Sequence, residues 1–292
     1  MSRPLIPDVH FPEIPLLPGT HSLSIKPFGL MVALGVCCGV ILAERMARAR
    51  GIPHGAMSKF MYWVLVCAFV LGHVLDVVLY HPQHILIYPL TLLRLWDGLS
   101  SFGGFAGALL GVFLFKWRYR VKHVLPFVDI MGAAFPVGWT FGRLGCAIVH
   151  DHPGIRSDLW IAVAFRTGGR LDLGFCEMLF AAVIAIVCLV LARRPRPPGF
   201  FVGFTMLVYA PVRFAMDFLR EAYKGDYSTD LRYLELTPAQ WGSIAMAAAG
   251  FAFLWYAASS GVVGNRPFRE ATRGAHPSLL GYDADESSPP AT

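Results

Sequence analysis

Long apolar runs alternate with short polar stretches along most of the chain, a pattern typical of a membrane protein that crosses the bilayer several times. Seven segments are long enough, or nearly long enough, to span as helices. They cover residues 27–46, 57–80, 102–117, 124–148, 173–192, 199–220 and 238–258. The stretch 81–101 mixes apolar residues with prolines and charges, which favours an interfacial segment. We therefore predict an all-α integral membrane protein of about seven transmembrane helices, with interfacial segments and a periplasmic loop region.

The two ends of the chain differ from this apolar middle. Residues 1–25 contain five prolines and no basic stretch followed by an unbroken apolar core. This argues against a cleaved signal peptide and predicts an extended arm along the outer membrane surface. Residues 260–292 are polar, which predicts a disordered cytoplasmic tail. The seven-helix membrane domain is expected over residues 26–259.

Composition supports the same class of protein. Of 292 residues, 55% are hydrophobic and 15% are charged, whereas soluble domains carry about 25% charged residues. The net charge of +6 does not indicate nucleic acid as a partner, because the basic residues form short clusters between apolar runs. Such clusters are an orientation signal.

Basic clusters follow the odd-numbered spans, whereas the loops after the fourth and sixth spans mix both signs of charge. The clusters are Arg45, Arg48, Arg50 and Lys59; Lys116, Arg118, Arg120 and Lys122; Arg193, Arg194 and Arg196; and Arg266, Arg269 and Arg273. The positive-inside rule then predicts an N-terminus outside the cytoplasm and a cytoplasmic C-terminus.

All six cysteines lie in apolar segments, without the spacing of a CxxC or Cys/His metal site. Buried thiols are therefore expected, and neither a metal nor a cofactor is predicted. A disulfide between Cys146 and Cys176 is a less favoured alternative.

One arginine stands out because it lies inside the fourth apolar segment. Arg143 is flanked by two glycines and is followed by His150, Asp151 and His152. An arginine in an apolar helix costs several kcal/mol unless something pairs with it. Two interpretations stay open: a wall of a site for an anionic head group, or an arginine that pairs with a buried carboxylate and holds helices together.

A second group of charges occupies the sixth span. Arg213 and Asp217 are four residues apart and share a helix face with Arg220. Asp217 could neutralise Arg213, or the arginines could outnumber the carboxylates and leave room for a phosphate. The second interpretation is favoured, because Pro211 is expected to break the helix beside Arg213, as happens where a membrane helix lines a cavity.

Topology places these charges at one level of the bilayer. At about 1.5 Å per residue, Arg143 lies about 28 Å along its helix and Arg213 about 21 Å along its own. Arg220 and Asp76 lie near the outer ends of their helices, and Glu177 lies about one turn in from outside. These groups are expected together in the outer third of the membrane.

The glycine-rich stretch 96–107 is a further candidate. Close packing of small residues accounts for Gly103 and Gly107. It accounts less well for Asp97 and Ser101, and the glycines Gly103 and Gly104 would also let a ligand approach the backbone.

Taken together, these segments resemble the prolipoprotein diacylglyceryl transferases of bacterial inner membranes. The resemblance rests on residues 25–31, 96–107, 129–154, 173–177, 209–220 and 236–242. It implies that a diacylglyceryl group moves from phosphatidylglycerol to the thiol of a lipobox cysteine in a prolipoprotein signal peptide. A thioether forms and glycerol phosphate leaves. The partners implied are phosphatidylglycerol, the precursor peptide and the lipid bilayer, and the N-terminus would be periplasmic.

Roles for individual residues follow as expectations. Arg143 and Arg213 would stabilise the phosphate during the reaction. The expected substrate-binding residues are Asp97, Ser101, Gly103, Gly104, Gly154, Glu177, Asp217 and Arg220.

The chain departs from the family pattern at four positions. Phe102 stands where the family usually has the histidine implied as catalytic base, Phe28 where it has tyrosine, His73 where it has arginine, and Cys146 where it has asparagine.

Two interpretations follow from the missing histidine. His150, His152 or both could replace the base, since imidazole titrates in the useful range. Alternatively, the chain is a silent or specialised paralogue that binds anionic phospholipid. A transporter is less favoured, because there is no repeat between halves and no ladder of charges across the bilayer.

Overall fold

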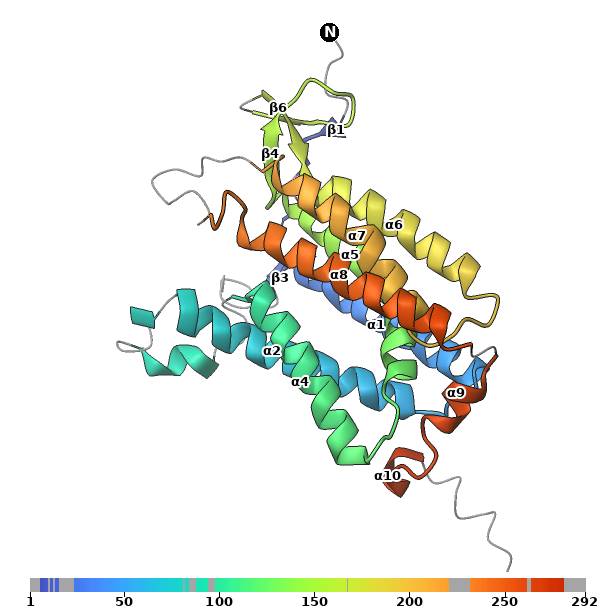
Figure 1. The fold of residues 1–292 in the computed structure, drawn as a ribbon. Helices are drawn as coiled ribbons and strands as arrows, with labels where there is room; N and C mark the ends of the chain where they lie inside the picture. The colour runs from blue at the N-terminus through green and yellow to red at the C-terminus, as the bar shows by residue number, and fades with distance from the viewer. Residues whose placement is uncertain are drawn as a thin grey trace, which may run out of the picture. The chain divides into compact units, whose positions relative to one another are not determined.

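The computed structural model describes residues 6–9, 11–12, 14–15, 24–80, 82–83, 88–93, 98–166, 168–220, 232–261 and 264–280. All seven predicted segments are helices (Figure 1). They are α1 (Pro27–Ala49), α2 (Ala56–Tyr80), α4 (Ser101–Tyr119), α5 (Leu125–Val149), α6 (Leu173–Leu191), α7 (Phe200–Asp217) and α8 (Pro238–Ser259). Among the described residues, α1, α2, α6, α7 and α8 are long and apolar enough to cross a membrane. The fold class is confirmed, and the number of seven spans stays a prediction.

The chain forms two compact units. The first contains Met1–Leu42 and Asp129–Val263, and the second contains Ala43–Val128 and Gly264–Thr292. The first unit therefore holds most of α1 and α5, together with α6, α7 and α8. The second holds α2 and α4 and the short helices η1 (Pro89–Leu93), α9 (Arg266–Glu270) and α10 (Pro277–Leu280).

Facing glycines bring the helices of the first unit close together. A Cβ added to Gly35 on α1 would lie 2.6 Å from the carbonyl oxygen of Gly138 on α5. A Cβ on Gly203 of α7 would lie 2.9 Å from the carbonyl oxygen of Gly250 on α8. Backbone contact of this kind is how membrane helices associate where water cannot drive burial.

A buried carboxylate fixes the start of α7. Asp129 on α5 accepts the backbone N–H of Phe201 at 2.6 Å and that of Val202 at 3.2 Å. These N–H groups belong to the first turn of a helix, where no earlier carbonyl is in reach. Asp129 thus sets the position of α7 against α5.

The helix α7 then continues without interruption to Asp217, with Pro211 inside it. The predicted break at Pro211 is wrong, since a membrane helix can absorb one missing N–H locally.

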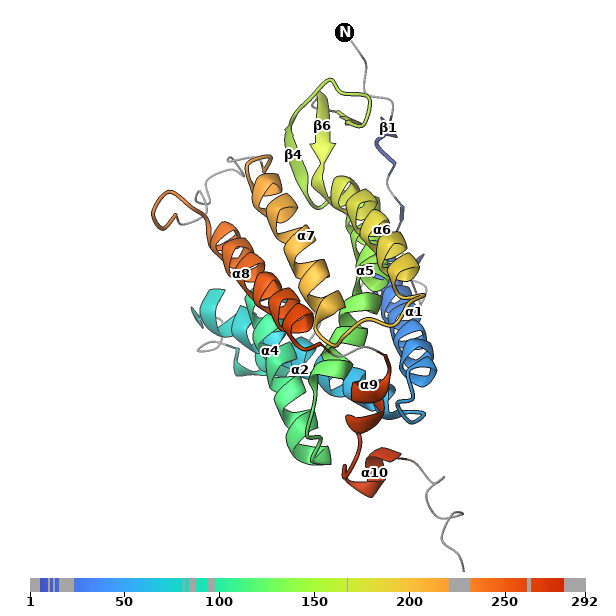
Figure 2. The same ribbon diagram turned by 45° about the vertical axis from the view of Figure 1, so that its right-hand side comes forward.

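The first unit also contains a small sheet that the sequence did not predict. Its strands are β1 (Ile6–Pro7), β4 (Pro153–Arg156), β5 (Val163–Phe165) and β6 (Gly168–Asp172), in the order β1-β5-β6-β4. It lies beyond the end of α5 and the start of α6 (Figures 1 and 2). Part of the N-terminal arm is thus a strand paired with β5, and β2 (Ile14–Pro15) pairs with β3 (Ser24–Ile25). Strands of two to five residues are too short to show a hydrophobic period.

In the second unit, α4 packs on α2 through glycines at every fourth position. Gly103, Gly107 and Gly111 are buried. A Cβ on Gly103 would lie 2.7 Å from the carbonyl oxygen of Leu71, and one on Gly111 would lie 2.5 Å from that of Trp63. The packing interpretation of Gly103 and Gly107 is supported by this contact.

The buried ring of His73 holds a further part of the second unit. Its Nδ1 lies 3.1 Å from the carbonyl oxygen of Gly98, and its Nε2 lies 3.0 Å from that of Thr91. This side chain therefore connects α2 to η1 and to Gly98, just before α4.

The tail differs from the predicted disorder. Residues 264–280 contain α9 and α10. The ring of Phe268 is fully buried, and the guanidinium of Arg50 lies 4.9 Å from its centre. The prediction of disorder is wrong for this stretch, because Phe268, Ala271 and Leu279 are fully buried. Residues 281–292 lie outside the described part of the chain.

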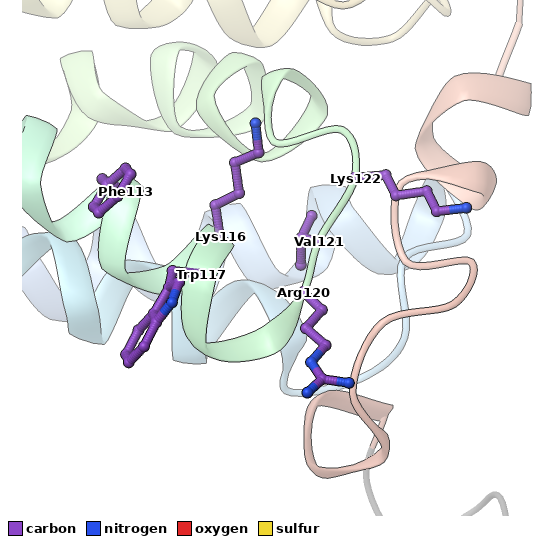
Figure 3. Close-up of a pocket in the computed structure, with 6 residues that line it drawn as sticks. All are labelled: Phe113, Lys116, Trp117, Arg120, Val121 and Lys122. Atoms are coloured by element: carbon purple, nitrogen blue, oxygen red, sulfur yellow. The ribbon is translucent and has the colours of Figure 1, made fainter.

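A shallow pocket at the end of α4 carries only basic charge. It is lined by Phe113, Lys116, Trp117, Arg120, Val121 and Lys122 (Figure 3). Lysine and arginine beside a tryptophan are typical of a membrane interface. This pocket therefore belongs with the cluster that predicts a cytoplasmic end for α4.

Candidate active site

Three helices of the first unit converge on Glu177, one turn into α6. Its carboxylate lies 3.1 Å from Nε of Arg143 on α5. It also accepts the indole N–H of Trp139 at 3.2 Å and the hydroxyl of Tyr209 on α7. The guanidinium of Arg143 lies 4.7 Å from the centre of the Trp139 ring. Glu177 and Arg143 are 5% and 15% exposed at their side chains, so this is a nearly dry, closely held ion pair.

This arrangement bears on both interpretations of Arg143. The buried carboxylate predicted by the simpler interpretation is Glu177. However, the ion pair uses Nε, and a guanidinium has four further N–H donors. One of its Nη groups is 3.8 Å from the sulfur of Cys146. Glu177 therefore fixes the plane of the guanidinium and directs its outer edge toward Cys146.

A second charged cluster surrounds Asp217 at the end of α7. One carboxylate oxygen lies 3.4 Å from Arg213 and 3.5 Å from Arg220. The other accepts the hydroxyl of Thr237, the N-cap of α8, at 2.5 Å. Arg213 and Asp217 share a face of α7 as predicted, whereas the prediction is wrong for Arg220, because α7 ends at Asp217. The side chains of Arg213 and Arg220 are 25% and 45% exposed, against 2% for Asp217.

The two clusters are connected along α7. Tyr209, which bonds Glu177, is one helical turn before Arg213 and lies on the same helix face. Contacts of 3.4–3.5 Å to Asp217 are longer than the 2.7–2.9 Å of strong charge-assisted bonds. The carboxylate thus positions Arg213 without using its planar fork in a two-bond pair.

Gly154 allows the sheet to approach this second cluster. It forms a bridge with Arg220, and the next N–H, of Ile155, donates to the carbonyl oxygen of Leu219 at 3.0 Å. A Cβ on Gly154 would lie 2.8 Å from that oxygen and 3.0 Å from the carbonyl oxygen of Leu171. Gly154 therefore acts here through packing, by letting β4 contact the chain that carries Arg220.

The two candidate histidines have different surroundings. His150 is 9% exposed at its side chain and bonds Asp172 at 2.6 Å, with Asp8 of the arm at 3.7 Å. Asp172 also caps α6 by accepting the N–H of Phe175. His152 bonds Asp151 and is 46% exposed. His150 is thus part of the framework at the start of α6, whereas His152 is accessible.

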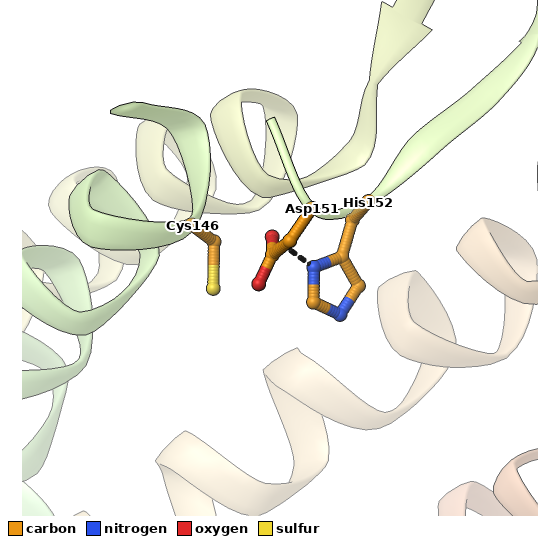
Figure 4. A group of neighbouring side chains, drawn as sticks. All are labelled: Cys146, Asp151 and His152. Atoms are coloured by element: carbon orange, nitrogen blue, oxygen red, sulfur yellow. Dashed lines mark hydrogen bonds and ion pairs between the residues drawn. The ribbon is translucent and has the colours of Figure 1, made fainter. Parts of the chain in front are cut away.

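A cluster that the sequence did not predict forms around His152. Potential ligand atoms of Cys146, Asp151 and His152 all lie within 4.8 Å of one another (Figure 4). Cys146 lies on the last turn of α5, and the chain reverses at His150, whose φ is 50°. All six cysteines are free. The sequence contains these residues as Cys-x4-Asp-His across the end of α5. The turn at His150 is what brings their ligand atoms close together.

The remaining predicted residues belong to the second unit or are not described. Ser101, Gly103 and Gly104 belong to α4 in the second unit, and Gly104 has no neighbour within 4 Å of an added Cβ. Asp97 lies outside the described residues. Substrate binding by these four residues stays a prediction.

Comparison with known proteins agrees with this architecture. The profile of the prolipoprotein diacylglyceryl transferase family matches residues 16–256. A phosphatidylglycerol–prolipoprotein diacylglyceryl transferase of Cupriavidus necator is 28% identical over 80% of this chain and 89% of its own length. Proteins of the same name from Chromohalobacter salexigens and Pseudomonas aeruginosa are each 29% identical, over 83% and 85% of this chain and 92% and 95% of their own lengths. With its apolar helices, the chain is a bacterial membrane protein, and it belongs to the prolipoprotein diacylglyceryl transferase family.

Proposed function

We propose that this protein transfers the diacylglyceryl group of phosphatidylglycerol to the lipobox cysteine of prolipoproteins. The cysteine sulfur forms a bond to the terminal glyceryl carbon, and the bond from that carbon to the phosphate oxygen breaks. Glycerol phosphate leaves with the electron pair, and the thiol proton is released. The relatives named for this reaction support the proposal over most of the chain. The enzyme would act in the inner membrane, with a periplasmic N-terminus and a cytoplasmic C-terminus.

The observation that carries the proposal is the held guanidinium of Arg143. Glu177 and Trp139 fix it before any substrate arrives. Preorganised donors aimed at a charge that develops in the transition state are the largest common source of catalysis. Here the leaving phosphate is anionic throughout, and the planar fork of arginine matches two of its oxygens.

Arg213 and Arg220 supply the second side of the phosphate site in this proposal. They share one oxygen of Asp217 at 3.4 and 3.5 Å, and both side chains are partly exposed. Phosphate oxygens could then be met by donors of Arg213 that the long contact to Asp217 does not occupy.

Thiol activation falls to the pair of Asp151 and His152 in this proposal. Of the two candidate histidines, His152 is the accessible one, and Asp151 orients its ring.

The alternative function, a paralogue that binds phospholipid without transfer, is favoured by one observation. Phe102, half exposed on α4, replaces the histidine usual in the family.

One assay separates the two functions. Purified full-length protein is mixed with labelled phosphatidylglycerol and a lipobox peptide, and the thioether product is measured. We expect product with the native chain and at most a hundredth as much with Arg143→Ala. Binding of phosphatidylglycerol without any thioether would contradict transfer and support the paralogue. Replacement of the essential transferase in depleted cells tests the same point in vivo.

A further inference from the structure

We propose that Cys146, Asp151 and His152 bind one thiophilic divalent cation, for which Zn²⁺ is the probe, and that this ion takes the precursor thiol. The inference rests on the proposed transfer reaction and specifies how the thiol is activated there. The sequence alone predicted no metal, because the three ligands are not in a familiar spacing. The fold brings them together at the end of α5 (Figure 4).

The positions of the three side chains are close to those of a tetrahedral site. Their ligand atoms lie within 4.8 Å of one another. In a zinc site with bonds of about 2.0–2.3 Å, neighbouring ligand atoms are about 3.3–3.7 Å apart. The ligand atoms would therefore have to move closer together when an ion binds.

The chemical types of the ligands favour zinc or a similar ion. A thiolate, an imidazole and a carboxylate are all zinc ligands, and the thiolate selects against magnesium and calcium. Sites with three protein ligands and one open position are typical of catalytic zinc. Here the open position would receive a fourth ligand from the substrate.

The three side chains differ in their exposure to solvent, and this difference suits the entry of an ion and a peptide. Cys146 is buried, whereas Asp151 and His152 are exposed. The fixed ligand therefore lies inward, and both outer ligands lie where solvent and a precursor can approach. Asp151 already contacts Nδ1 of His152, so the two outer side chains are adjacent before an ion binds.

Arg143 places this cluster beside the proposed phosphate site. One of its Nη groups is 3.8 Å from the sulfur of Cys146, while its Nε is paired with Glu177. The same guanidinium would then lie between the bound thiolate and the phosphate that leaves.

The step balances without a redox partner. The precursor thiol loses its proton to water as its sulfur binds the ion, which lowers the thiol pKa. The bound thiolate attacks the glyceryl carbon, the carbon–sulfur bond forms, and the carbon–oxygen bond to phosphate breaks. The ion keeps its charge throughout. The thioether product is a weaker ligand than the thiolate and is released.

A binding experiment tests the site without measuring activity. Full-length protein, purified through a tag free of histidine, is stripped with a chelator and loaded with Zn²⁺ or Co²⁺. We expect one ion per chain, and a thiolate-to-cobalt absorption band that Cys146→Ser removes. Asp151→Asn and His152→Gln should weaken binding at least tenfold. Cys37→Ser, which changes an exposed thiol on α1, is the matched control and should bind as the native chain does. Equal metal content and an unchanged band in Cys146→Ser would overturn the site.

Substrate and activity arms test its role. A lipobox peptide should strengthen the cobalt band, and the same peptide with serine in place of cysteine should not. Metal-stripped protein should transfer at most a tenth as fast as protein reloaded with Zn²⁺. Full transfer by stripped protein would overturn the metal's role and leave the proposed function intact. Transfer in neither state would instead contradict the proposed function, while the cobalt band would still decide whether the site exists.

Discussion

Arg143 is held through its Nε, which forms an ion pair with Glu177, and through one Nη group, which contacts the sulfur of Cys146. The sequence identified this arginine and its two possible roles, because a single guanidinium in an apolar segment is conspicuous. It could not decide between the roles, because the partner lies 34 positions away on another helix. The structure combines them: the buried carboxylate fixes the group whose outer edge we propose to meet phosphate.

Arg143→Lys should therefore lower kcat/KM for transfer at least a hundredfold, or about 2.7 kcal/mol of transition-state stabilisation. Lysine keeps the charge but cannot pair with Glu177 and present a planar fork at once. Arg166→Lys, at an exposed turn between β5 and β6, is the control and should leave the rate unchanged. Transfer at the native rate by Arg143→Lys would contradict two-bond phosphate recognition.

Substitution of His150 and substitution of His152 should lower the rate of transfer for different reasons. His150→Gln loses its bond to Asp172 at the start of α6, so we expect a lower melting temperature and, with it, reduced transfer. His152→Gln removes an accessible ring with one partner, so transfer should fall at least tenfold with an unchanged melting temperature. Thermal unfolding and initial rates, measured on the same preparations, separate the two effects. A double variant with full activity would remove histidine from the mechanism.

At the scale of elements, the apolar runs predicted the helices well. A local signal also marks the start of α8, where Thr237 and Gln240 form a capping box. The small sheet was missed because its strands are shorter than one readable period. The predicted break at Pro211 was wrong because the loss of one backbone N–H at a proline does not by itself end a helix. Whether the helix breaks depends on its neighbours, here the contacts of α7 with α5 and α8.

Gly154→Ala should disable the enzyme through packing. The new methyl group would lie 2.8 Å from the carbonyl oxygen of Leu219, closer than real side chains allow. The strand β4 must move away, and with it the chain at Arg220. We expect at least a tenfold loss of transfer. Gly242→Ala on α8 meets nothing within 4 Å and serves as control. A native rate for Gly154→Ala would show that β4 does not position Arg220.

Asp129→Ala should loosen the start of α7. The substitution leaves two backbone N–H groups without their carboxylate, at a cost of about 1–3 kcal/mol in the free energy of unfolding. Chemical denaturation in detergent micelles measures the change. Glu235→Gln, an exposed carboxylate before α8, is the control and should change stability by less than about 0.5 kcal/mol. Equal stability of the two variants would contradict the capping role.

At the scale of the whole molecule, the sequence predicted one membrane domain and a disordered tail, whereas the structure has two compact units. The tail belongs to the second unit through the buried ring of Phe268. No periodic signal marks this anchor, because the few buried apolar residues of the tail are scattered through a polar stretch. The division of the middle helices between units likewise depends on long-range contacts that a linear pattern does not contain.

The charge clusters make a prediction at this scale. Basic pockets at the ends of α4 and α6 carry no acidic residue among those that line them, as expected of cytoplasmic ends. Green fluorescent protein fused to the C-terminus should therefore fluoresce in cells, and alkaline phosphatase at the same position should be inactive. Active phosphatase there would reverse the proposed orientation.

Asp217 serves Arg213, Arg220 and Thr237 at once, so these side chains form one thermodynamic unit. Substitutions among them should not add: once one member is gone, loss of a second should cost less than it does in the native chain. Evolutionary change in this cluster would then require several positions to change together, including Thr237, the N-cap of α8. A substitution of Thr237 would thus reach both arginines through Asp217, although its hydroxyl contacts neither of them in the interactions described.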